Sequence, residues 1–242
     1  MTVKPLLSLV LPAFNEEGNI LPLAAELAEV LPALAPWAVE CLFVDDGSTD
    51  GTRAEMIAAR SRYPALGVRI VALDGNYGLT AAMDAGFRSA RGEVVATLDT
   101  DGQNDPRDLP RLLAELGRAD VVIGIRVRRQ DSLVKRLSSK VANAIRNRAT
   151  HEDIPDIGCS LKAYRREYLD RLKLFTGMHR FLPTLLKMEG ARVVQVPVNH
   201  RTRGAGRAKY GLANRLAGPL ADLLAVRWML KRHLHYRTEE LP

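Results

Sequence analysis

The sequence predicts an α/β fold in which a central, mostly parallel sheet is flanked by helices. Short apolar runs without polar interruptions recur over residues 1–125, and stretches with a helical pattern separate them. Such runs are typical of strands buried on both faces, and their alternation with helices is typical of parallel sheets. Polar loops follow three of the runs. Open parallel sheets bind ligands beyond the carboxyl ends of their strands, so we expect these loops to meet in one crevice.

The elements of the first half follow one another regularly. Strands are predicted at residues 6–11, 39–44, 68–73, 94–98 and 121–123. Helices are predicted at residues 19–31, from residue 51 onward, at 79–90 and at 106–116. Loops rich in acidic and polar residues follow the first, second and fourth strands.

The second half has a less regular pattern. Residues 159–164 and 193–198 predict two further strands, and residues 200–211 predict a loop rich in glycine and arginine. Residues 212–236 return to an interrupted helical pattern, in which Gly218-Pro219 is expected to break or kink the helix. Trp228 lies near Lys231 and Arg232 there, a combination that suits a membrane interface.

A basic amphipathic helix is predicted at residues 130–148. Its apolar positions are Leu133, Val134, Leu137, Val141 and Ile145, and its basic positions are Lys135, Arg136, Lys140, Arg146 and Arg148. Two interpretations stay open. The helix either lies on a membrane surface or packs its apolar face on the core and leaves the basic face in water.

Charge is distributed unevenly along the chain, whose net charge is +7. Residues 1–120 carry 10 Lys/Arg and 18 Asp/Glu, a net charge of −8, whereas residues 121–242 carry 25 and 10, a net charge of +15. The acidic half suits a metal, and the basic half suits phosphates or an anionic surface. Nucleic acid is a competing partner for the basic half. Acids beside phosphates repel without a metal, so we expect no nucleic-acid partner.

The cysteines and the apolar runs indicate the cellular compartment of the protein. Cys41 and Cys159 both lie in apolar, strand-like runs, which predicts buried free thiols and fits a reducing cytoplasm. No secretory signal is visible, and no run reaches the roughly 18 uncharged apolar residues of a membrane span. Residues 212–230 come nearest but contain Arg215, Asp222 and Arg227. We therefore expect no transmembrane helix.

The acidic element at residues 99–103 carries the strongest sign of chemistry. Asp99 and Asp101 are two positions apart after a strand, so we expect their carboxylates to point the same way. Gln103 can add an amide oxygen, because Gly102 lets the chain bend. An oxygen-only ligand set suits Mg²⁺ or Mn²⁺, whereas zinc would favour His or Cys. The oxygens of a substrate diphosphate would complete the coordination.

Two other phosphate-binding patterns are absent from the sequence. There is no G-x-x-x-x-G-K-[ST] loop. Gly204-Ala205-Gly206 lacks the third glycine and the strand–helix setting of a dinucleotide fingerprint. We therefore expect a metal and arginines to hold the diphosphate.

Three motifs in order resemble the family 2 glycosyltransferases. They are LPAFNEE at residues 11–17, VDDGSTDGT at 44–52 and LDTDGQ at 98–103. Three further stretches make the chain most similar, within that family, to the dolichol- or polyprenol-phosphate sugar synthases: RLSSKVAN at 136–143, DIGCSLK at 156–162, and His200-Arg201 through Gly206 to Lys209-Tyr210-Gly211. The matches span residues 8 to 211, and the ordered set is highly specific.

The resemblance implies a GT-A type nucleotide-sugar-binding fold and a role for each matching residue. Base and ribose would contact Pro12, Phe14, Glu16 and Asp46, with Asp45 close by. Metal and diphosphate would be held by Asp99, Asp101 and Gln103. The acceptor phosphate would meet Arg126, Lys135, Arg136 and Ser139, which with Asp101 form the catalytic set. A mobile loop carrying Arg203, Arg207 and Lys209 would close over the diphosphate.

Two positions depart from the family pattern and leave the sugar open. Gly75 precedes Asn76-Tyr77-Gly78 where the family often has arginine, and Ala208 stands where a serine is expected. The resemblance also implies a catalytic domain over residues 1–211. Residues 212–242 would then form a C-terminal amphipathic helix for a membrane interface or an oligomer contact.

The implied reaction is an inverting transfer of a sugar from a GDP- or UDP-sugar to a polyprenyl phosphate, assisted by Mg²⁺ or Mn²⁺. A phosphate monoester is largely dianionic at neutral pH and needs no general base. The alternative is a family 2 enzyme that acts on a hydroxyl of a glycan or lipid and uses Asp156, with Asp153 as the second candidate, as the base. A nucleotidyltransferase is disfavoured, because its usual Gly-rich N-terminal loop with a catalytic Lys or Arg is absent.

The partners implied are a nucleotide-sugar donor, a polyprenyl-phosphate acceptor and an anionic membrane surface. A homo-oligomer and a separate membrane-anchoring partner both stay open. The expected location is the cytoplasm, with the protein peripheral on the cytoplasmic face of the membrane.

Overall fold

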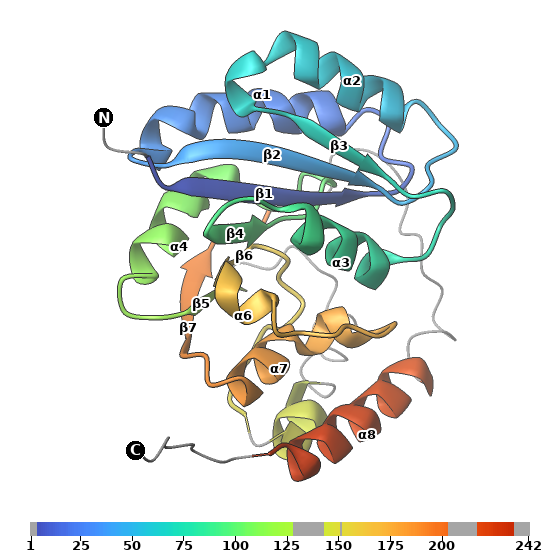
Figure 1. The fold of residues 1–242 in the computed structure, drawn as a ribbon, viewed down its shortest axis with the longest axis vertical. Coiled ribbons are helices and arrows are strands. Elements are labelled where there is room, and N and C mark those ends of the chain that lie inside the picture. The colour runs from blue at the N-terminus through green and yellow to red at the C-terminus, as the bar shows by residue number, and fades with distance from the viewer. Residues whose placement is uncertain (1–3, 128–142, 151, 203–216, 235–242) are drawn as a thin grey trace, which may run out of the picture.

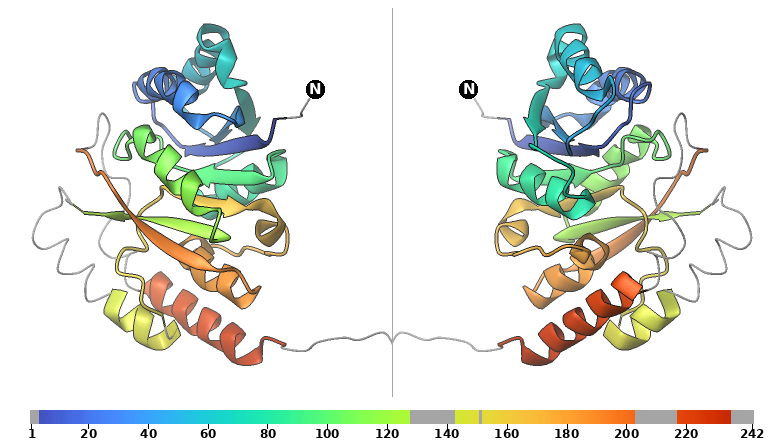
Figure 2. Two further views of the ribbon diagram at one scale, coloured as in Figure 1. Left: turned by 90° about the vertical axis from the view of Figure 1, so that its left-hand side faces the viewer. Right: turned by 90° about the vertical axis from the view of Figure 1, so that its right-hand side faces the viewer.

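The computed structural model describes residues 4–127, 143–150, 152–202 and 217–234. These residues form a seven-stranded sheet with helices on both faces (Figures 1 and 2). The strand order is β3-β2-β1-β4-β6-β5-β7. The strands are β1 (Leu6–Ala13), β2 (Ala38–Asp45), β3 (Arg69–Ala72), β4 (Val94–Thr97), β5 (Val121–Arg126), β6 (Lys162–Arg165) and β7 (Val193–Val198).

The sheet is mostly parallel, as predicted. Strand β6 lies between β4 and β5 and is antiparallel to both, and the other neighbouring pairs are parallel. Each predicted apolar run contributes to a strand, with differences at the ends. The fifth strand continues to Arg126, and the strand predicted at residues 159–164 begins only at Lys162, because a turn at residues 157–158 precedes it.

Helices cover the sheet on two sides, which explains why most positions of its strands are apolar. Leu9 is fully buried against the side covered by α1 (Ile20–Val30), α2 (Thr52–Arg62) and α4 (Leu109–Glu115). Val10, the next residue, is fully buried against the side covered by α3 (Leu79–Ser89), α6 (Arg166–Leu169) and α7 (Leu182–Met188). Alternate side chains of a strand point to opposite faces, so both faces of β1 must be apolar.

The helix predicted at residues 106–116 divides into two parts. A 3₁₀ turn, η3 (Pro106–Asp108), precedes α4. The side chain of Asp105 caps this turn by accepting a hydrogen bond from the backbone N–H of Arg107. The acidic loop at residues 99–103 is thus followed directly by a capped turn.

The C-terminal helix α8 (Ala217–Arg232) packs against α7 and the short 3₁₀ helix η4 (Met178–Phe181). Leu223 and Val226 of α8 lie in a buried cluster with Phe181 and Leu185. The predicted break at Gly218-Pro219 is not seen within α8, because these residues lie in its first turn, where proline is tolerated. Residues 212–216 lie outside the described residues, so the predicted domain boundary at 211 stays a prediction.

The assignment of Arg146 to the basic face of the helix predicted at residues 130–148 was wrong. Residues 143–150 are helical, but Ile145, predicted on the apolar face, is 55% exposed, and Arg146, predicted on the basic face, is 5% exposed. The guanidinium of Arg146 donates to the backbone oxygen of Ile154 at 2.8 Å and lies 3.8 Å from the carboxylate of Glu152. A buried charge needs such partners, and they outweigh the periodicity of a short helix. The remainder of the helix predicted at residues 130–148 lies outside the described residues.

Two predictions about the chain as a whole can be compared with the structure. Cys41 and Cys159 are buried free thiols, as predicted. Burial raises the pKa of the Cys159 thiol to about 11. None of the helices in the described parts of the chain combines the length and apolarity needed to cross a bilayer.

Candidate active site

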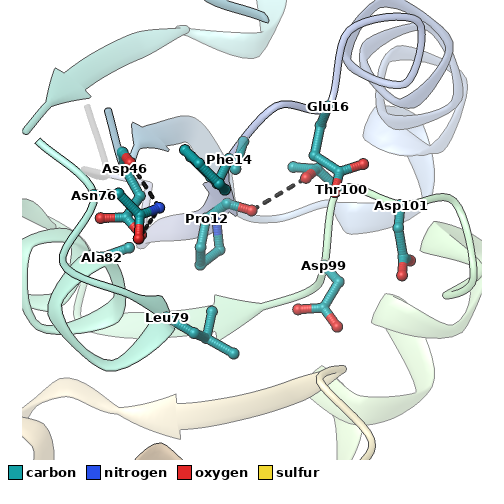
Figure 3. Close-up of a pocket in the computed structure, with 11 residues that line it drawn as sticks. Pro12, Phe14, Glu16, Asp46, Asn76, Leu79, Ala82, Asp99, Thr100 and Asp101 are labelled. Atoms are coloured by element: carbon teal, nitrogen blue, oxygen red, sulfur yellow. Dashed lines mark hydrogen bonds between the residues drawn. The ribbon is translucent and has the colours of Figure 1, made fainter. Parts of the chain in front are cut away.

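The polar loops after β1, β2 and β4 meet at the carboxyl edge of the sheet, as predicted. They line a cavity with an empty volume of about 680 Å³ (Figure 3). Residues of three further positions complete its wall: Asn76 in the loop after β3, and Leu79 and Ala82 of α3. The predicted residues that line it are Pro12, Phe14, Glu16, Asp46, Asp99 and Asp101. The structure therefore brings together six predicted side chains from segments that are far apart in the sequence.

The acidic loop is placed by a turn and not by the pleat of a strand. Strand β4 ends at Thr97, two residues before Asp99, so the alternation argument for the two carboxylates does not apply. The hydroxyl of Thr100 donates to the backbone oxygen of Pro12 at 3.1 Å and fastens the loop to the end of β1. Figure 3 shows the carboxylates of Asp99 and Asp101 on the side of the loop away from Thr100. The predicted common direction holds, for a different reason.

Gln103 does not contribute to the cavity wall. Its backbone N–H donates to Oδ1 of Asp101 at 3.0 Å, and its backbone oxygen accepts from the N–H of Arg201 at 2.9 Å. It therefore shapes the loop through its backbone, and the metal-ligand role predicted for its side chain stays a prediction.

Asp46 organises the loop that follows β3. Its Oδ1 accepts from the backbone N–H of Tyr77 at 2.8 Å, and its Oδ2 accepts from that of Gly78 at 2.8 Å and from Nδ2 of Asn76 at 3.2 Å. Gly47 makes room for this loop, since a Cβ there would lie 2.4 Å from the carbonyl carbon of Gly75. The side chain of Asp46 thus builds the cavity wall as well as lining it.

Asp45 has a supporting position beneath the cavity. It is fully buried, with Oδ1 accepting from the N–H of Ser48 at 2.8 Å and Oδ2 accepting from Nε of Arg53 at 2.8 Å. These bonds fix the turn after β2, which presents Asp46. Direct contact between Asp45 and a nucleotide remains a prediction.

Glu16 is held in place from two sides. Its backbone N–H donates to the hydroxyl of Thr52 at 2.7 Å, and its Oε2 accepts from Nδ2 of Asn19 at 2.7 Å. With 8% of its surface exposed, it presents a carboxylate on the cavity wall opposite the α3 side. Phe14 lies beside it and offers an aromatic surface to a planar base.

The chemistry of the cavity fits a divalent metal at Asp99 and Asp101. Over the described ranges, no group of three or more His, Cys, Asp or Glu gathers around one point. The chain would therefore supply two carboxylates and leave positions for diphosphate oxygens and water. That arrangement is usual for Mg²⁺, which keeps several waters and is bound by one or two carboxylates and a substrate phosphate.

Arg126, at the end of β5, is paired with Asp156. Nε and Nη2 of the guanidinium each donate to one carboxylate oxygen of Asp156 at 2.7 Å, and the backbone N–H of Arg126 donates at 3.2 Å. The side chains are only 13% and 6% exposed. This two-pronged geometry is the strongest that a carboxylate and an arginine can form. Asp156 thus holds Arg126 in position, and its oxygens are already engaged with a cation.

Six predicted residues lie outside the described residues: Lys135, Arg136, Ser139, Arg203, Arg207 and Lys209. The chain that leads to the last three is placed beside the acidic loop. His200 forms an isolated bridge with Asn104, and Arg201 pairs with Glu26 and Asp105 through its guanidinium. The described chain therefore runs along Gln103 and Asn104 immediately before residue 203.

A second cavity adjoins the first and was not predicted. It shares Pro12, Leu79 and Asp99 with the first cavity and has an empty volume of about 700 Å³. Its other lining residues include Ser160, Lys162, His179 and Arg180. Burial, with the nearby charges of Arg180 and Lys162, lowers the pKa of His179 to about 3, so this ring is neutral at pH 7. Sequence spacing offers no signal for it, because its walls come from β4, β6 and η4.

The loop after β3 was compared with the family pattern, but none of its residues was predicted to line the site. Its signal was present in the sequence, because Asp74, Gly75 and Asn76 follow the third predicted strand as polar residues. The same rule that selected the other three loops applies to it.

Comparison with known proteins identifies relatives of the whole fold. The model of the family "Glycosyl transferase family 2" matches residues 8–173 of this chain. A dodecaprenyl-phosphate galacturonate synthase of Rhizobium johnstonii is 40% identical over 232 residues, 93% of this chain and 67% of the relative. An undecaprenyl-phosphate 4-deoxy-4-formamido-L-arabinose transferase of Yersinia enterocolitica is 36% identical over 219 residues, 90% and 66% of the two chains. The chain thus spans about two thirds of the length of these relatives.

Solved structures confirm the GT-A type fold. A glucosyl-3-phosphoglycerate synthase of Mycobacterium tuberculosis, crystallised with Mn²⁺, UDP-glucose and phosphoglyceric acid, superposes with a TM-score of 0.70 at 22% identity, covering 93% of this chain and 80% of that one. A mannosyltransferase of Pyrobaculum calidifontis with GDP-mannose and Mn²⁺ has a TM-score of 0.61 at 21% identity, covering 96% and 71%. At these identities the similarity establishes the fold alone.

Proposed function

Because the chain belongs to glycosyl transferase family 2, we propose that it transfers a sugar, with inversion, from a GDP- or UDP-sugar to a polyprenyl phosphate. The observation that carries this proposal is the pair of carboxylates, Asp99 and Asp101, on the wall of a cavity that continues past Asp99 into a second one. A nucleotide in the first cavity would point its diphosphate at that pair. The two relatives, named for transfer to prenyl phosphates, support the acceptor.

The nucleotide is assigned to the side of the first cavity nearest β1 and β2. Phe14 offers a stacking face, and Pro12 and Ala13 line the wall beside it. Glu16 and Asp46 place carboxylates where they can accept hydrogen bonds from ribose hydroxyls or base N–H groups. The choice between guanine and uracil is left open.

A divalent ion, Mg²⁺ or Mn²⁺, is assigned to Asp99 and Asp101, with the side chain of Gln103 as a third ligand. Bound there, the ion would neutralise the charge that develops on the leaving diphosphate. Through such an ion the two carboxylates would orient the diphosphate and so align the bond that breaks. Arg203, Arg207 and Lys209 are assigned to the same anion from the loop that begins beside Gln103.

The acceptor phosphate is assigned to Arg126 together with Lys135, Arg136 and Ser139. A phosphate oxygen attacks the anomeric carbon from the side opposite the diphosphate. The bond from that carbon to the diphosphate breaks, and its electron pair leaves with the diphosphate. A dianionic phosphate carries no proton that must be removed. The engagement of Asp156 with Arg126 supports this acceptor over a hydroxyl, which would need a free base.

Helix α8 supports attachment to a membrane surface. Leu220, Leu224 and Trp228 recur at every fourth position and are 56%, 62% and 64% exposed. Positions four apart share a helix face, so these side chains form one apolar stripe. Arg227, Lys231 and Arg232 lie on the same helix, and a basic residue near an anionic membrane contributes about 1 kcal/mol. We assign this stripe to the interface of an anionic membrane on the cytoplasmic side.

The proposed transfer is tested by mass spectrometry of the lipid product. The purified chain is incubated with undecaprenyl phosphate, Mn²⁺ and a panel of GDP- and UDP-sugars. A sugar phospholipid formed from one donor supports the proposal, and its formation should fall at least about 100-fold in Asp101→Asn. Asp84→Asn is the matched control, because Asp84 lies on α3 in a surface pair with Arg88. Transfer only to a hydroxyl acceptor would refute the proposed acceptor.

Membrane attachment has a separate test by flotation with vesicles. The wild-type chain should float with vesicles that contain anionic lipid and remain behind with neutral ones. Trp228→Gln should weaken flotation, whereas Ile57→Gln, a change at an exposed apolar residue of α2, should not. Equal flotation of the wild type and Trp228→Gln would show that α8 does not contact the membrane.

A further inference from the structure

The second cavity lies where the group attached to the diphosphate would be. It begins at Asp99, which also lines the first cavity, and extends between β4, β6 and η4. Leu79, Met83 and Ile157 give it apolar walls, and Ser160 and Thr97 add hydroxyls. A sugar ring presents apolar C–H faces and polar edges, so a wall of this mixed kind suits it.

Lys162 is the unusual residue of this cavity. It is 5% exposed, it lies on a central strand, and it lines the cavity. Among the described residues its Nζ atom forms no hydrogen bond or ion pair, and neighbouring charges act on it only through space. A buried ammonium without a direct partner is costly, and proteins rarely keep one unless a ligand completes it. Burial accordingly lowers the pKa of Lys162, and Cys159, Asp99 and Asp156 act in the opposite direction.

The neighbouring charges leave Lys162 available to a ligand. Asp156 is engaged by Arg126 through two bonds of 2.7 Å. Asp99 lies at the junction with the first cavity, where it faces the diphosphate side. Arg180 adds a second cation, and it is only loosely paired with Asp222 of α8, at 3.6 Å. Among the residues that line this cavity, two cations therefore face one carboxylate, and that carboxylate is already assigned.

We propose that the second cavity holds the donor sugar and that Lys162, with Arg180, binds a carboxylate on that sugar. The donor is then a nucleotide-linked uronic acid. This inference rests on the proposed function for the placement of the diphosphate, and it adds the class of the sugar. A neutral hexose in the same place would leave Lys162 without a direct counter-charge and Arg180 with only its long pair to Asp222.

An anionic group of the acceptor is the other candidate for Lys162. The cavity favours the sugar, because it shares Asp99 with the first cavity, whereas the guanidinium of Arg126 is bonded to Asp156 and is not among the residues that line the second cavity. The acceptor phosphate already has a cation in Arg126. The experiment below separates the two.

The test measures donor binding by calorimetry, which needs no acceptor. Three matched pairs are compared with Mn²⁺ present: UDP-glucuronate with UDP-glucose, UDP-galacturonate with UDP-galactose, and GDP-mannuronate with GDP-mannose. The members of each pair differ only at C6, where one has a carboxylate and the other a hydroxymethyl group. We expect the wild type to bind the acid of one pair at least about tenfold more tightly than its neutral partner.

Variants then assign the preference to residues. Lys162→Met keeps the length of the side chain and removes the charge, and should weaken binding of the preferred acid about 30-fold or more while changing the neutral partner little. Arg180→Met, a second variant at a more exposed position, should reduce the same preference by a smaller factor. Lys173→Met, at an exposed lysine outside the cavity, is the control for net charge. Thermal unfolding of each variant shows that it is folded.

Each outcome decides the inference. Loss of the acid preference in Lys162→Met but not in Lys173→Met supports it. A wild type that binds the neutral members as tightly as the acids overturns it, and so does equal weakening of both members by Lys162→Met. If Lys162→Met leaves donor binding unchanged but weakens the use of polyprenyl phosphate, Lys162 binds the acceptor, and this result also overturns the inference. Selective acid binding without transfer to polyprenyl phosphate would refute the proposed acceptor and leave this inference standing.

Discussion

Replacing Asp156 with asparagine separates the two acceptor chemistries and measures the pair it forms with Arg126. The variant keeps the shape of the side chain and removes its charge. Two charged hydrogen bonds of 2.7 Å are affected, between side chains that are 13% and 6% exposed. Hydrogen bonds to charged groups contribute about 1.5–3 kcal/mol each, and asparagine can still accept one of the two. We therefore expect a loss of about 2–4 kcal/mol in the free energy of unfolding.

Thermal unfolding gives the readout of stability. In a chain of this size each kcal/mol corresponds to about 2–4 °C, so the midpoint should fall by about 5–15 °C. Asp153→Asn is the matched control, since Asp153 is exposed and should change stability by less than about 0.5 kcal/mol. Equal stability of Asp156→Asn and the wild type would contradict the pairing seen here.

Single-turnover kinetics gives the readout of chemistry, at a temperature where the variant is folded. If a phosphate is the nucleophile, Asp156 only positions Arg126, and the rate should stay within about tenfold of the wild type. If a hydroxyl is the nucleophile, loss of the base should lower the rate by about 10²–10⁴-fold with donor binding intact. The second result would refute the reasoning that no general base is needed.

Three further predictions follow from the site and its surroundings. Gly47→Ala should lower the free energy of unfolding by at least about 2 kcal/mol more than Gly190→Ala does. Both glycines have a positive φ, but only a Cβ at Gly47 would meet backbone atoms, at 2.4 Å. Denaturant unfolding compares the two variants, and equal losses would contradict the close approach of the loop after β3. Burial lowers the pKa of His179 to about 3, so below pH 6.5 the unfolded chain binds a proton more readily than the folded chain does. The free energy of unfolding should therefore keep its full value above pH 6.5 and fall by up to about 2 kcal/mol as the pH drops to 5. His179→Gln should flatten this dependence on pH. Removal of divalent metal with EDTA should abolish sugar transfer, and Mn²⁺ or Mg²⁺ should restore it; full activity in EDTA would contradict the metal assignment.

The sheet could be predicted from the sequence because strands buried on both faces appear as short, continuous apolar runs. Leu9 and Val10 are adjacent residues of β1 packed on opposite layers, so neither position tolerates a polar side chain. Once the strands are recognised, the rule for carboxyl ends places the loops that carry Glu16, Asp46 and Asp99 together. Six predicted side chains line the first cavity for this reason.

What could not be predicted depends on contacts between distant residues. Arg146 was misplaced because its partner Glu152 is also tied to Thr184 and Lys187 of α7, contacts that helical periodicity does not record. The role of Asp46 in shaping the loop at residues 76–78 likewise depends on bonds across about 30 positions of the chain. In the sequence, Lys162 is one polar residue in a predicted strand, and only the structure shows that it lines a cavity.

Helix α8 places an acid beside two residues that line the second cavity or precede its wall, Arg180 and Gly177. Asp222 lies 3.6 Å from Arg180, and a Cβ at Gly177 would lie 2.1 Å from a carboxylate oxygen of Asp222. The hydroxyl of Thr80 bonds the N–H of Gly177 and the ring of His179, so this contact is passed on to α3. Any force that tilts α8, such as insertion of Trp228 into lipid, would therefore move Arg180 and His179 as well. If α8 binds the membrane and the second cavity holds the sugar, as proposed, attachment and the choice of sugar are coupled through these contacts. A truncated chain without α8 would then be expected to lose donor discrimination before it loses its fold.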